Sequence, residues 1–190
     1  MLDGTNFVDK EFNMGIWSIA YNGLYKIKDF NENWKISRAA SAVRKIEDIE
    51  VGFICGSILN PKDCFEFDGT TLTLNNNILS HGHTDEAAMI DTQYGLLLLG
   101  GGENPFYLNN KGDKNPENTT RHGIAEISED GQTWFQSCAV FPYPIVETTL
   151  VELKSRVWLF GGYFGEPKDW VYTLDIKVSW FNICDMFVTV

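Results

Sequence analysis

Short runs that are wholly apolar or alternate with polar residues recur along the chain, separated by glycine, asparagine, aspartate and proline. The clearest of these runs are Gly15–Ala20, Val51–Cys55, Leu96–Leu99 and Val157–Phe160. Such brief runs between turn formers predict β-strands, whereas a long helix would show a sustained apolar period of 3.6 residues. A helix-like pattern at Arg38–Ile49 runs on into a strand-like stretch. The sequence therefore predicts an all-β protein.

An internal repeat organises these strands. The segment Thr148–Gly162, TTLVELKSRVWLFGG, aligns without a gap with Ala87–Gly101, AAMIDTQYGLLLLGG. A weaker third copy, Ala40–Gly56, has Cys55-Gly56 at the place of the glycine pair. Self-similarity of this kind indicates a repeat architecture in which each copy is one supersecondary unit.

Each copy continues with a second strand and a large closing residue. The last two copies close on Trp134 and Trp180, and the copy before them closes on Leu72. Asp68-Gly69 and Asp130-Gly131 fall at the same point ahead of the closing residue. We therefore predict that these two dipeptides form the same turn in two copies.

The spacing of the copies indicates an insertion. The step from Cys55 to Gly100 is 45 residues, whereas the step from Gly100 to Gly161 is 61. The polar segment Glu103–Thr120, ENPFYLNNKGDKNPENTT, matches the difference. Its content of asparagine, proline and glycine predicts a surface loop.

The repeat unit resembles the kelch repeat, in which one unit is a four-stranded blade of a β-propeller. The resemblance is carried by Gly100, Gly101, Trp134, Gly161, Gly162, Tyr172 and Trp180. It implies that the glycines end strands at points of close backbone approach, and that the aromatic residues fill the space between blades. We expect a partial kelch-like β-propeller of about three to four four-stranded blades.

The repeat register divides one propeller domain, 1–190, into units. The expected units are a partial blade at 1–34, blades at 35–72, 73–134 (with the inserted loop 103–120) and 135–180, and a tail at 181–190. The tail either starts the next blade or closes a four-bladed ring with the N-terminal strands. A fragment of a larger propeller is the preferred hypothesis.

The net charge and the length of the apolar runs argue against two classes of partner, nucleic acids and membranes. Fifteen basic against 26 acidic side chains give a formal net charge of −11, which repels phosphate backbones, so no nucleic-acid partner is expected. Leu96–Leu99 is far shorter than the roughly 20 apolar residues that span a bilayer, so no membrane partner is expected. Because MLDGTNFVDKEF lacks the features of a secretory signal, we expect a cytoplasmic protein, or an extracellular one if a leader is missing.

Cysteines and histidines are the candidate metal ligands. The cysteines are Cys55, Cys64, Cys138 and Cys184, without a CxxC pair. We expect them to be buried or partly buried free thiols, although their even number also permits disulfides. The segment His81–Glu86 contains HxHxD, whose two imidazoles and carboxylate could share an ion. In the repeat register it falls between two units, so we favour a linker and expect no metal and no cofactor.

Two enzyme classes remain as alternatives. Ile127–Trp134, ISEDGQTW, resembles the Asp-box of sialidases, but its Asp130 and Gly131 are adjacent where the box has one residue between them. Sialidases also need an arginine cluster, and the chain has four arginines. A copper enzyme similar to galactose oxidase would need a tyrosine and histidine set that we do not recognise here. A glycan-active or copper-dependent enzyme is therefore the alternative, and we expect no enzyme.

The leading hypothesis is a non-enzymatic protein-interaction module. Kelch resemblance implies protein binding without naming the partner. Loops at the Gly-Gly ends of the strands would line one surface, next to the predicted insertion. The expected contact residues are Phe106, Tyr107, Arg121, Tyr163 and Lys168.

Overall fold

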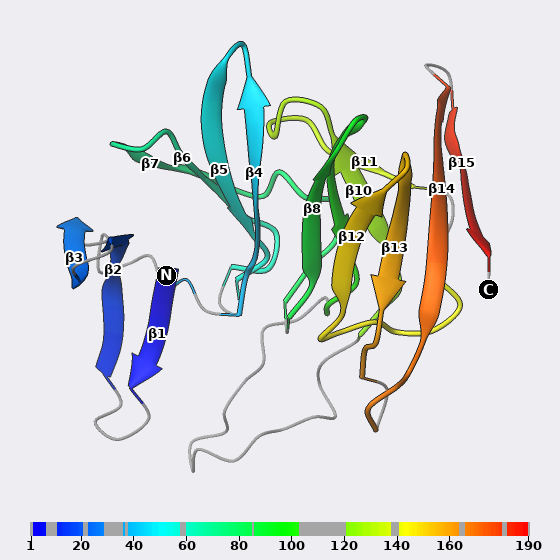
Figure 1. Cartoon of the computed structure of the whole chain (residues 1–190), viewed down its shortest axis with the longest axis horizontal. Helices are drawn as coiled ribbons and strands as arrows, with labels where there is room; N and C mark the ends of the chain where they lie inside the picture. Colours follow the sequence, from blue (N-terminus) through cyan, green and yellow to red (C-terminus); the bar gives the residue numbers. More distant parts are fainter. Residues whose placement is uncertain are drawn as a thin grey trace.

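The computed structural model of the chain is built of β-strands (Figure 1). It describes residues 2–6, 11–20, 23–28, 36, 38–57, 60–84, 86–102, 121–137, 141–163, 166–179 and 182–189. Over these ranges fifteen strands form four antiparallel sheets, and no helix occurs. The prediction of an all-β protein is confirmed.

Each sheet is an antiparallel meander of consecutive strands. The first sheet contains β1 (Leu2–Asn6), β2 (Glu11–Ala20) and β3 (Gly23–Lys28). The second contains β4 (Ala40–Ile46), β5 (Ile49–Cys55), β6 (Cys64–Phe67) and β7 (Leu72–Asn75). The third contains β8 (Ala88–Thr92), β9 (Gly95–Leu99), β10 (Ala125–Ser128) and β11 (Phe135–Gln136). The fourth contains β12 (Thr149–Leu153), β13 (Arg156–Phe160), β14 (Val171–Ser179) and β15 (Asn182–Thr189).

The sheets follow one another in chain order, with the first sheet at one end of the row and the fourth at the other (Figure 1). The first strands of the second, third and fourth sheets lie side by side, because β4 contacts β8 and β8 contacts β12. One apolar cluster lies between the second and third sheets, and another lies between the third and fourth. These three sheets are therefore stabilised by packing on one another.

Strand β9 shows why one run of the sequence is apolar at every position. Leu96 and Leu98 belong to the cluster shared with the second sheet, whereas Leu97 and Leu99 belong to the cluster shared with the fourth. Successive side chains of a strand point to opposite faces, so a strand covered on both faces needs apolar residues throughout.

A repeated backbone joint connects the sheets. Arg38, Glu86 and Glu147 each lie two residues before the first strand of a sheet, and each has a left-handed φ, of 55°, 68° and 54°. The N–H of Glu86 donates to the carbonyl of Arg38 at 3.3 Å, and the N–H of Glu147 donates to the carbonyl of Glu86 at 3.1 Å. The same position in three repeats therefore forms a hydrogen-bonded chain from one sheet to the next.

The strand pairing corrects the predicted register of one copy. Cys55 pairs with Ala40 as Leu99 pairs with Ala88, so Cys55 corresponds to Leu99 and not to Gly100. The predicted match of Cys55-Gly56 to the glycine pair is wrong by one residue. Gly56 takes the first glycine position, with a φ of 73° against 76° at Gly100.

Close backbone approach explains these glycines. A Cβ on Gly56 would lie 2.1 Å from the carbonyl oxygen of His83, and a Cβ on Gly100 would lie 2.2 Å from that of Ile145. Both oxygens belong to connections that lead into the next sheet. Gly161 and Gly162 have positive φ values of 68° and 130°, but more space around them. Their requirement for glycine is therefore conformational.

The predicted unit ends at 72, 134 and 180 fall at or just ahead of the fourth strand of a sheet. Strand β7 begins at Leu72 and β11 follows directly on Trp134, the two residues that we expected to close their units. The tail 181–190 was expected to start a new blade or to pair with the N-terminal strands. Instead β15 pairs with β14, from Ser179 with Asn182 to Thr173 with Thr189. A hairpin between strands adjacent in sequence closes a short loop at low entropic cost.

The predicted turn equivalence is confirmed. The Asp68 Oδ1 atom accepts the N–H groups of Thr70 and Thr71 at 2.8 and 2.6 Å. The Asp130 Oδ1 atom accepts those of Gln132 and Thr133, both at 2.8 Å. Both turns therefore use an aspartate side chain to satisfy the N–H groups two and three residues ahead.

Two predicted packing residues lie between sheets. Trp134 is buried in the cluster of the second and third sheets, and its indole N–H donates to the carbonyl of Gly131 at 3.0 Å. Tyr172 is buried between the third and fourth sheets, edge to face with Phe141 at a ring distance of 4.7 Å. Trp180 lies outside the described residues.

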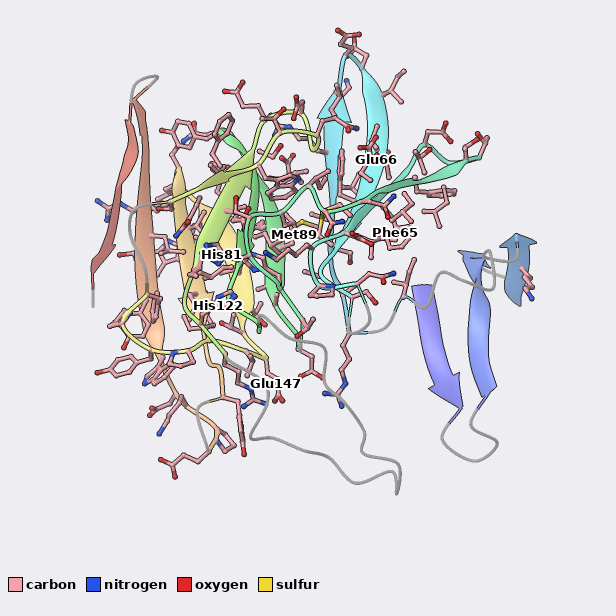
Figure 2. The ribbon with its side chains drawn as sticks, turned by 180° about the vertical axis from the view of Figure 1, so that it is seen from behind. Phe65, Glu66, His81, Met89, His122 and Glu147 are labelled. Atoms are coloured by element: carbon pink, nitrogen blue, oxygen red, sulfur yellow. A yellow bond between two sulfur atoms is a disulfide. The ribbon has the colours of Figure 1, made fainter. Side chains whose placement is uncertain are left out.

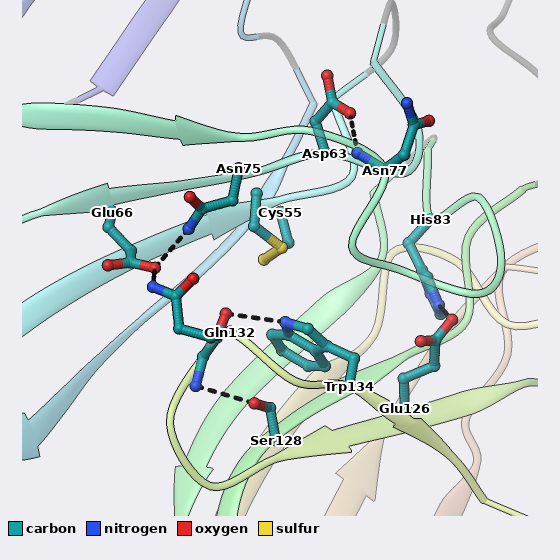
Figure 3. Close-up of a disulfide and its surroundings, with 12 residues drawn as sticks. Cys55, Asp63, Glu66, Asn75, Asn77, His83, Glu126, Ser128, Gln132 and Trp134 are labelled. Carbon is teal, nitrogen blue, oxygen red and sulfur yellow. Dashed lines mark hydrogen bonds and ion pairs between the residues drawn. A yellow bond between two sulfur atoms is a disulfide. The ribbon is translucent and has the colours of Figure 1, made fainter.

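The expectation of free thiols is wrong for two of the four cysteines. Cys55 and Cys64 form a disulfide with an S–S distance of 2.01 Å, next to Trp134 (Figure 3). The two residues are direct partners on neighbouring strands β5 and β6, with a Cα–Cα distance of 4.1 Å. This pairing depends on the strand register, which the cysteine spacing in the sequence did not reveal. The side chains of Cys138 and Cys184 lie outside the described ones.

Candidate functional site

The two ends of the sheets differ in the kind of connection that they carry. At one end lie the tight turns within the β4–β5, β8–β9 and β12–β13 hairpins, which we call the hairpin end. At the other end lie Gly56, Gly100 and Gly161 together with the connections that run from sheet to sheet, and we call it the linker end.

Three of the predicted contact residues lie at the linker end. Arg121, Tyr163 and Lys168 all belong to segments that follow or precede the glycine positions there. Phe106 and Tyr107 lie outside the described residues. The structure therefore places the three predicted residues that it describes at the same end of the sheets.

Arg121 and Tyr163 lie in contact. The guanidinium carbon of Arg121 is 5.8 Å from the centre of the Tyr163 ring, within the range of a cation–π interaction. Arg121 forms a β-bridge with Gly102, and the Tyr163 N–H donates to the carbonyl of Val146 at 3.0 Å. Backbone pairing therefore fixes the main chain at both residues, and with it the point from which each side chain starts.

Lys168 lies beside Trp170, which stacks on Tyr143, and neither aromatic residue was predicted as a contact residue. Its ammonium is 6.0 Å from the centre of the Trp170 ring and 2.6 Å from the Glu166 carboxylate. Trp170 stacks on the exposed ring of Tyr143, with ring centres 5.3 Å apart and planes 25° apart. A signal was present in the sequence, because Tyr143 lies between two prolines and such a segment presents its aromatic side chain on a stiff backbone.

Main-chain hydrogen bonds hold these groups together. The Gly161 N–H donates to the carbonyl of Trp170, and the Lys168 N–H donates to that of Gly162, both at 2.8 Å. We define the aromatic-cation surface by the residues Arg121, Tyr143, Tyr163, Lys168 and Trp170. It offers two cations and three aromatic rings, which together bind by stacking, apolar contact and charge.

The segment that begins at His81 and carries the HxHxD motif has a different role. Glu126 of β10 is fully buried, and its carboxylate accepts the N–H groups of Ser80 and His81 at 3.0 and 2.8 Å (Figure 3 shows its position beside His83). The Nε2 atom of His83 lies 3.2 Å from the same carboxylate, and its Nδ1 atom lies 2.7 Å from the carbonyl oxygen of Gly100. Glu126 and His83 therefore fasten the connection between β7 and β8 onto the third sheet, which confirms the prediction of a linker.

The electrostatics of Glu126 fit this role. Burial alone would raise the pKa of the Glu126 carboxyl group. The interactions with His83 and the two backbone N–H groups outweigh burial, so the pKa lies below its ordinary value of 4.5. Glu126 therefore holds the connection as an anion at neutral pH.

The three histidines lie together but bond to separate groups (Figure 2 shows His81 next to His122). The ring of His122 is 5.1 Å from that of His83, and its Nε2 atom is 2.7 Å from the carbonyl oxygen of Gly82. The His81 Nε2 atom is 3.0 Å from the Gln136 Oε1 atom. Within the described ranges no three histidine, cysteine, aspartate or glutamate side chains are placed to hold a metal ion. Asp85, the carboxylate of the HxHxD motif, lies outside those ranges.

Comparison with known proteins finds a similar fold but no related sequence. No family model matches the chain, and no curated protein matches it. A solved structure, "Structure of YjhT", is similar with a TM-score of 0.68 and 15% identity, over 96% of this chain and 54% of that one. The described residues contain no helix long and apolar enough to cross a membrane. The chain thus shares an all-β fold with a protein of which it spans about half the length.

Proposed function

We propose that the chain is four consecutive blades of a kelch-type β-propeller and acts as a non-enzymatic protein-interaction module. Three features support the propeller. The first strands β4, β8 and β12 lie side by side, as the inner strands of blades do around an axis. Trp134 and Tyr172 fill the spaces between sheets. The joint through Glu86 and Glu147 repeats the same step from sheet to sheet.

The aromatic-cation surface carries the proposal of protein binding. Tyr143, Tyr163 and Trp170 offer apolar contact area on side chains with few rotatable bonds, so little entropy is lost on binding. Tyrosine, tryptophan and arginine are the residues most often responsible for binding energy in protein interfaces. The net charge of −11 favours a basic or neutral partner over an acidic one.

The test begins with capture of the partner. A photoreactive amino acid at position 143 would cross-link the bound protein, which mass spectrometry then identifies and which is purified for affinity measurement. We expect the triple variant Arg121→Ala, Tyr163→Ala, Trp170→Ala to weaken binding by at least about 100-fold, the effect of losing two or three central side chains. The control is Val43→Ala with Ile49→Ala, which removes exposed apolar residues of the β4–β5 hairpin.

The outcomes separate the two functional classes. Unchanged affinity of the triple variant, with an unchanged circular dichroism spectrum, would contradict the proposed surface. Stoichiometric copper in the purified protein, or turnover of a fluorogenic sialoside, would favour the enzyme alternative. We expect neither.

We also propose an oxidising compartment in place of the cytoplasm. Disulfides are rare in the cytosol, where thioredoxin and glutathione keep thiols reduced, and the buried Cys55–Cys64 pair supports a site where disulfides persist. Alkylation of thiols in freshly broken cells, followed by mass spectrometry, tests this. Alkylated Cys55 and Cys64 in most molecules would restore the cytoplasmic assignment.

A further inference from the structure

The hydrogen bonds of His83 determine how many protons its ring carries. His83 and Glu126 are both 0% exposed and lie face to face (Figure 3). The Nδ1 atom of His83 lies 2.7 Å from the carbonyl oxygen of Gly100, and its Nε2 atom lies 3.2 Å from the Glu126 carboxylate. A carbonyl oxygen and a carboxylate are both acceptors without a hydrogen to donate. Each ring nitrogen of His83 therefore faces a group that requires a donor.

A neutral imidazole can donate to only one of these two groups, because it carries one N–H and one lone pair. With the hydrogen on Nδ1, the lone pair of Nε2 would face the Glu126 carboxylate. With the hydrogen on Nε2, the lone pair of Nδ1 would face the carbonyl oxygen of Gly100. A buried polar group left without its hydrogen bond is costly. The imidazolium ion, with a hydrogen on both nitrogens, is the form that satisfies both acceptors.

The other bonds of Glu126 favour a proton on the histidine over a proton on the carboxylate. Burial opposes the ionised carboxyl group, but His83 and the N–H groups of Ser80 and His81 outweigh it, so the pKa of Glu126 is lowered. A buried anion is strongly destabilising when no cation lies beside it. Within the described ranges, the ion pair of Glu126 is with His83.

The neighbouring histidine has the opposite arrangement. The centre of the His122 ring lies 5.1 Å from that of His83. The Nδ1 atom of His122 accepts the N–H of Ile124 at 3.2 Å, so its Nε2 atom carries the hydrogen and donates to the carbonyl of Gly82 at 2.7 Å. One accepted and one donated bond suit a neutral imidazole. The geometry therefore distinguishes a charged ring from a neutral ring beside it.

We propose that His83 is an imidazolium ion in the folded protein, and that loss of its proton releases the connection between β7 and β8 from the third sheet. After that loss, the lone pair of Nε2 faces the carboxylate of Glu126, and the buried anion has no cation beside it. A proton held by the folded state stabilises that state at lower pH, and this contribution is lost as the pH rises. The connection is therefore held most firmly where Glu126 is ionised and His83 is charged.

The other titratable groups close to this pair bond to different atoms. The Nε2 atom of His81 lies 3.0 Å from the Oε1 atom of Gln136. The ammonium of Lys62, in the loop between β5 and β6, donates to the carbonyl of Ser80 at 2.8 Å. His122 lies against His83 but bonds as a neutral ring. Among the described groups, the proton of His83 is therefore the one that determines the charge next to Glu126.

The same connection supports one side of the aromatic-cation surface. Thr84 exchanges two main-chain hydrogen bonds with Gly102, at 3.0 and 2.9 Å. Gly102 in turn forms the β-bridge with Arg121. Release of the connection therefore removes bonds that hold Gly102 beside Arg121, and we expect weaker partner binding as the pH rises. This expectation rests on the proposed function, whereas the release itself is measured in the isolated chain.

The first test is the charge of each ring. Nitrogen-15 NMR of the histidine side chains at neutral pH separates a ring with two N–H groups from a ring with one. We expect two on His83 and one on His122. A single N–H on His83 at neutral pH would overturn the proposal. The measurement uses the wild-type chain, so it does not depend on the folding of a variant.

The second test is release of the connection. Amide exchange at Ser80 and His81, expressed as protection relative to an unstructured chain, is followed as the pH is raised. We expect protection to fall by at least about tenfold as the His83 spectrum changes to that of a neutral ring. This fall should be absent in His83→Gln and present in the matched control His122→Gln.

Two results would overturn the release. One is protection of Ser80 and His81 that stays constant while the His83 ring loses its charge. The other is a His83 ring that keeps both hydrogens until the whole chain unfolds. Neither measurement involves a partner, so failure of the protein-binding proposal leaves this one intact, and the reverse also holds.

Discussion

The main-chain N–H of Glu147 donates to the carbonyl of Glu86 at 3.1 Å, and both residues have left-handed φ values, of 54° and 68°. The two residues hold the same position in consecutive repeats. Because the bond joins backbone to backbone, the sequence can vary there, and Arg38 occupies the same position in the repeat before. What this position requires is a conformation and not a particular side chain.

The effect of a substitution at Glu147 on stability should therefore depend on how well the new residue tolerates a positive φ, and not on its charge. Glu147→Val should lower the free energy of unfolding by about 1–2 kcal/mol, because a β-branched residue is strained at positive φ. Glu147→Asn, which tolerates this conformation, should be neutral or slightly stabilising. Urea titration of both variants checks the order. Equal losses for valine and asparagine would show that the carboxylate itself matters.

Gly131 and Gly69 form a matched pair. They occupy the same aspartate turn, with φ values of 76° and 94°, but a Cβ on Gly131 would lie 2.0 Å from the Phe53 ring, whereas one on Gly69 meets nothing within 4 Å. Gly69→Ala should cost about 1–2 kcal/mol for the strained backbone. Gly131→Ala should cost about 3 kcal/mol or more, because the clash with the second sheet adds to the strain. Thermal unfolding of the two variants measures the difference, and equal shifts would contradict the contact with Phe53.

Glu126→Gln should lower the free energy of unfolding by about 2 kcal/mol, because the amide loses a charge that accepts two backbone N–H groups and contacts His83. Glu129→Gln is the control, since Glu129 lies exposed three residues further along the chain. Denaturant titrations at neutral pH compare the two. A loss no larger for Glu126→Gln than for Glu129→Gln would refute the fastening role of Glu126.

The difference in unfolding free energy between the wild type and Glu126→Gln should depend on pH. The pKa of Glu126 is lowered in the folded protein from its ordinary value of 4.5, so the unfolded chain takes up the proton first as pH falls. The contribution of Glu126 is therefore fully present above about pH 5 and is lost as the pH falls through the folded-state pKa. The stability difference between wild type and Glu126→Gln should be constant near neutral pH and shrink in acid. A difference that grows in acid would have the wrong sign.

The disulfide should contribute to stability through the unfolded chain. Cys55 and Cys64 are nine residues apart, and closing a loop of that size corresponds to about 2.5–3 kcal/mol. Reduction of the wild type should lower the midpoint of urea unfolding accordingly. The double variant Cys55→Ala, Cys64→Ala should unfold at the same midpoint with and without reductant. A reductant effect of equal size in both proteins would mean that another group is responsible.

The sequence predicted the strands and the repeat because both depend on local patterns. The apolar run Leu96–Leu99 and the two aspartate turns were identified correctly. The register at Cys55 was one residue off, since a small residue at the end of an apolar run resembles the start of a glycine pair. Strand pairing, which no local pattern encodes, decides that position.

The candidate site was only partly predictable for the same reason. Arg121, Tyr163 and Lys168 were found from their places beside the glycines. Trp170 lies two residues from Lys168, but Tyr143 joins the set only through its stacking on Trp170, which is far from it in the sequence. The Cys55–Cys64 bond likewise depends on which strands become neighbours.

The bridge between Gly102 and Arg121 separates the sheet from the segment 103–120. Gly102 and Arg121 lie opposite each other, just beyond the pairing of β9 with β10. The cost of lengthening a loop closed in this way grows only with the logarithm of its length. This segment is therefore the natural position at which to exchange, extend or graft a foreign peptide without disturbing the order of the sheets.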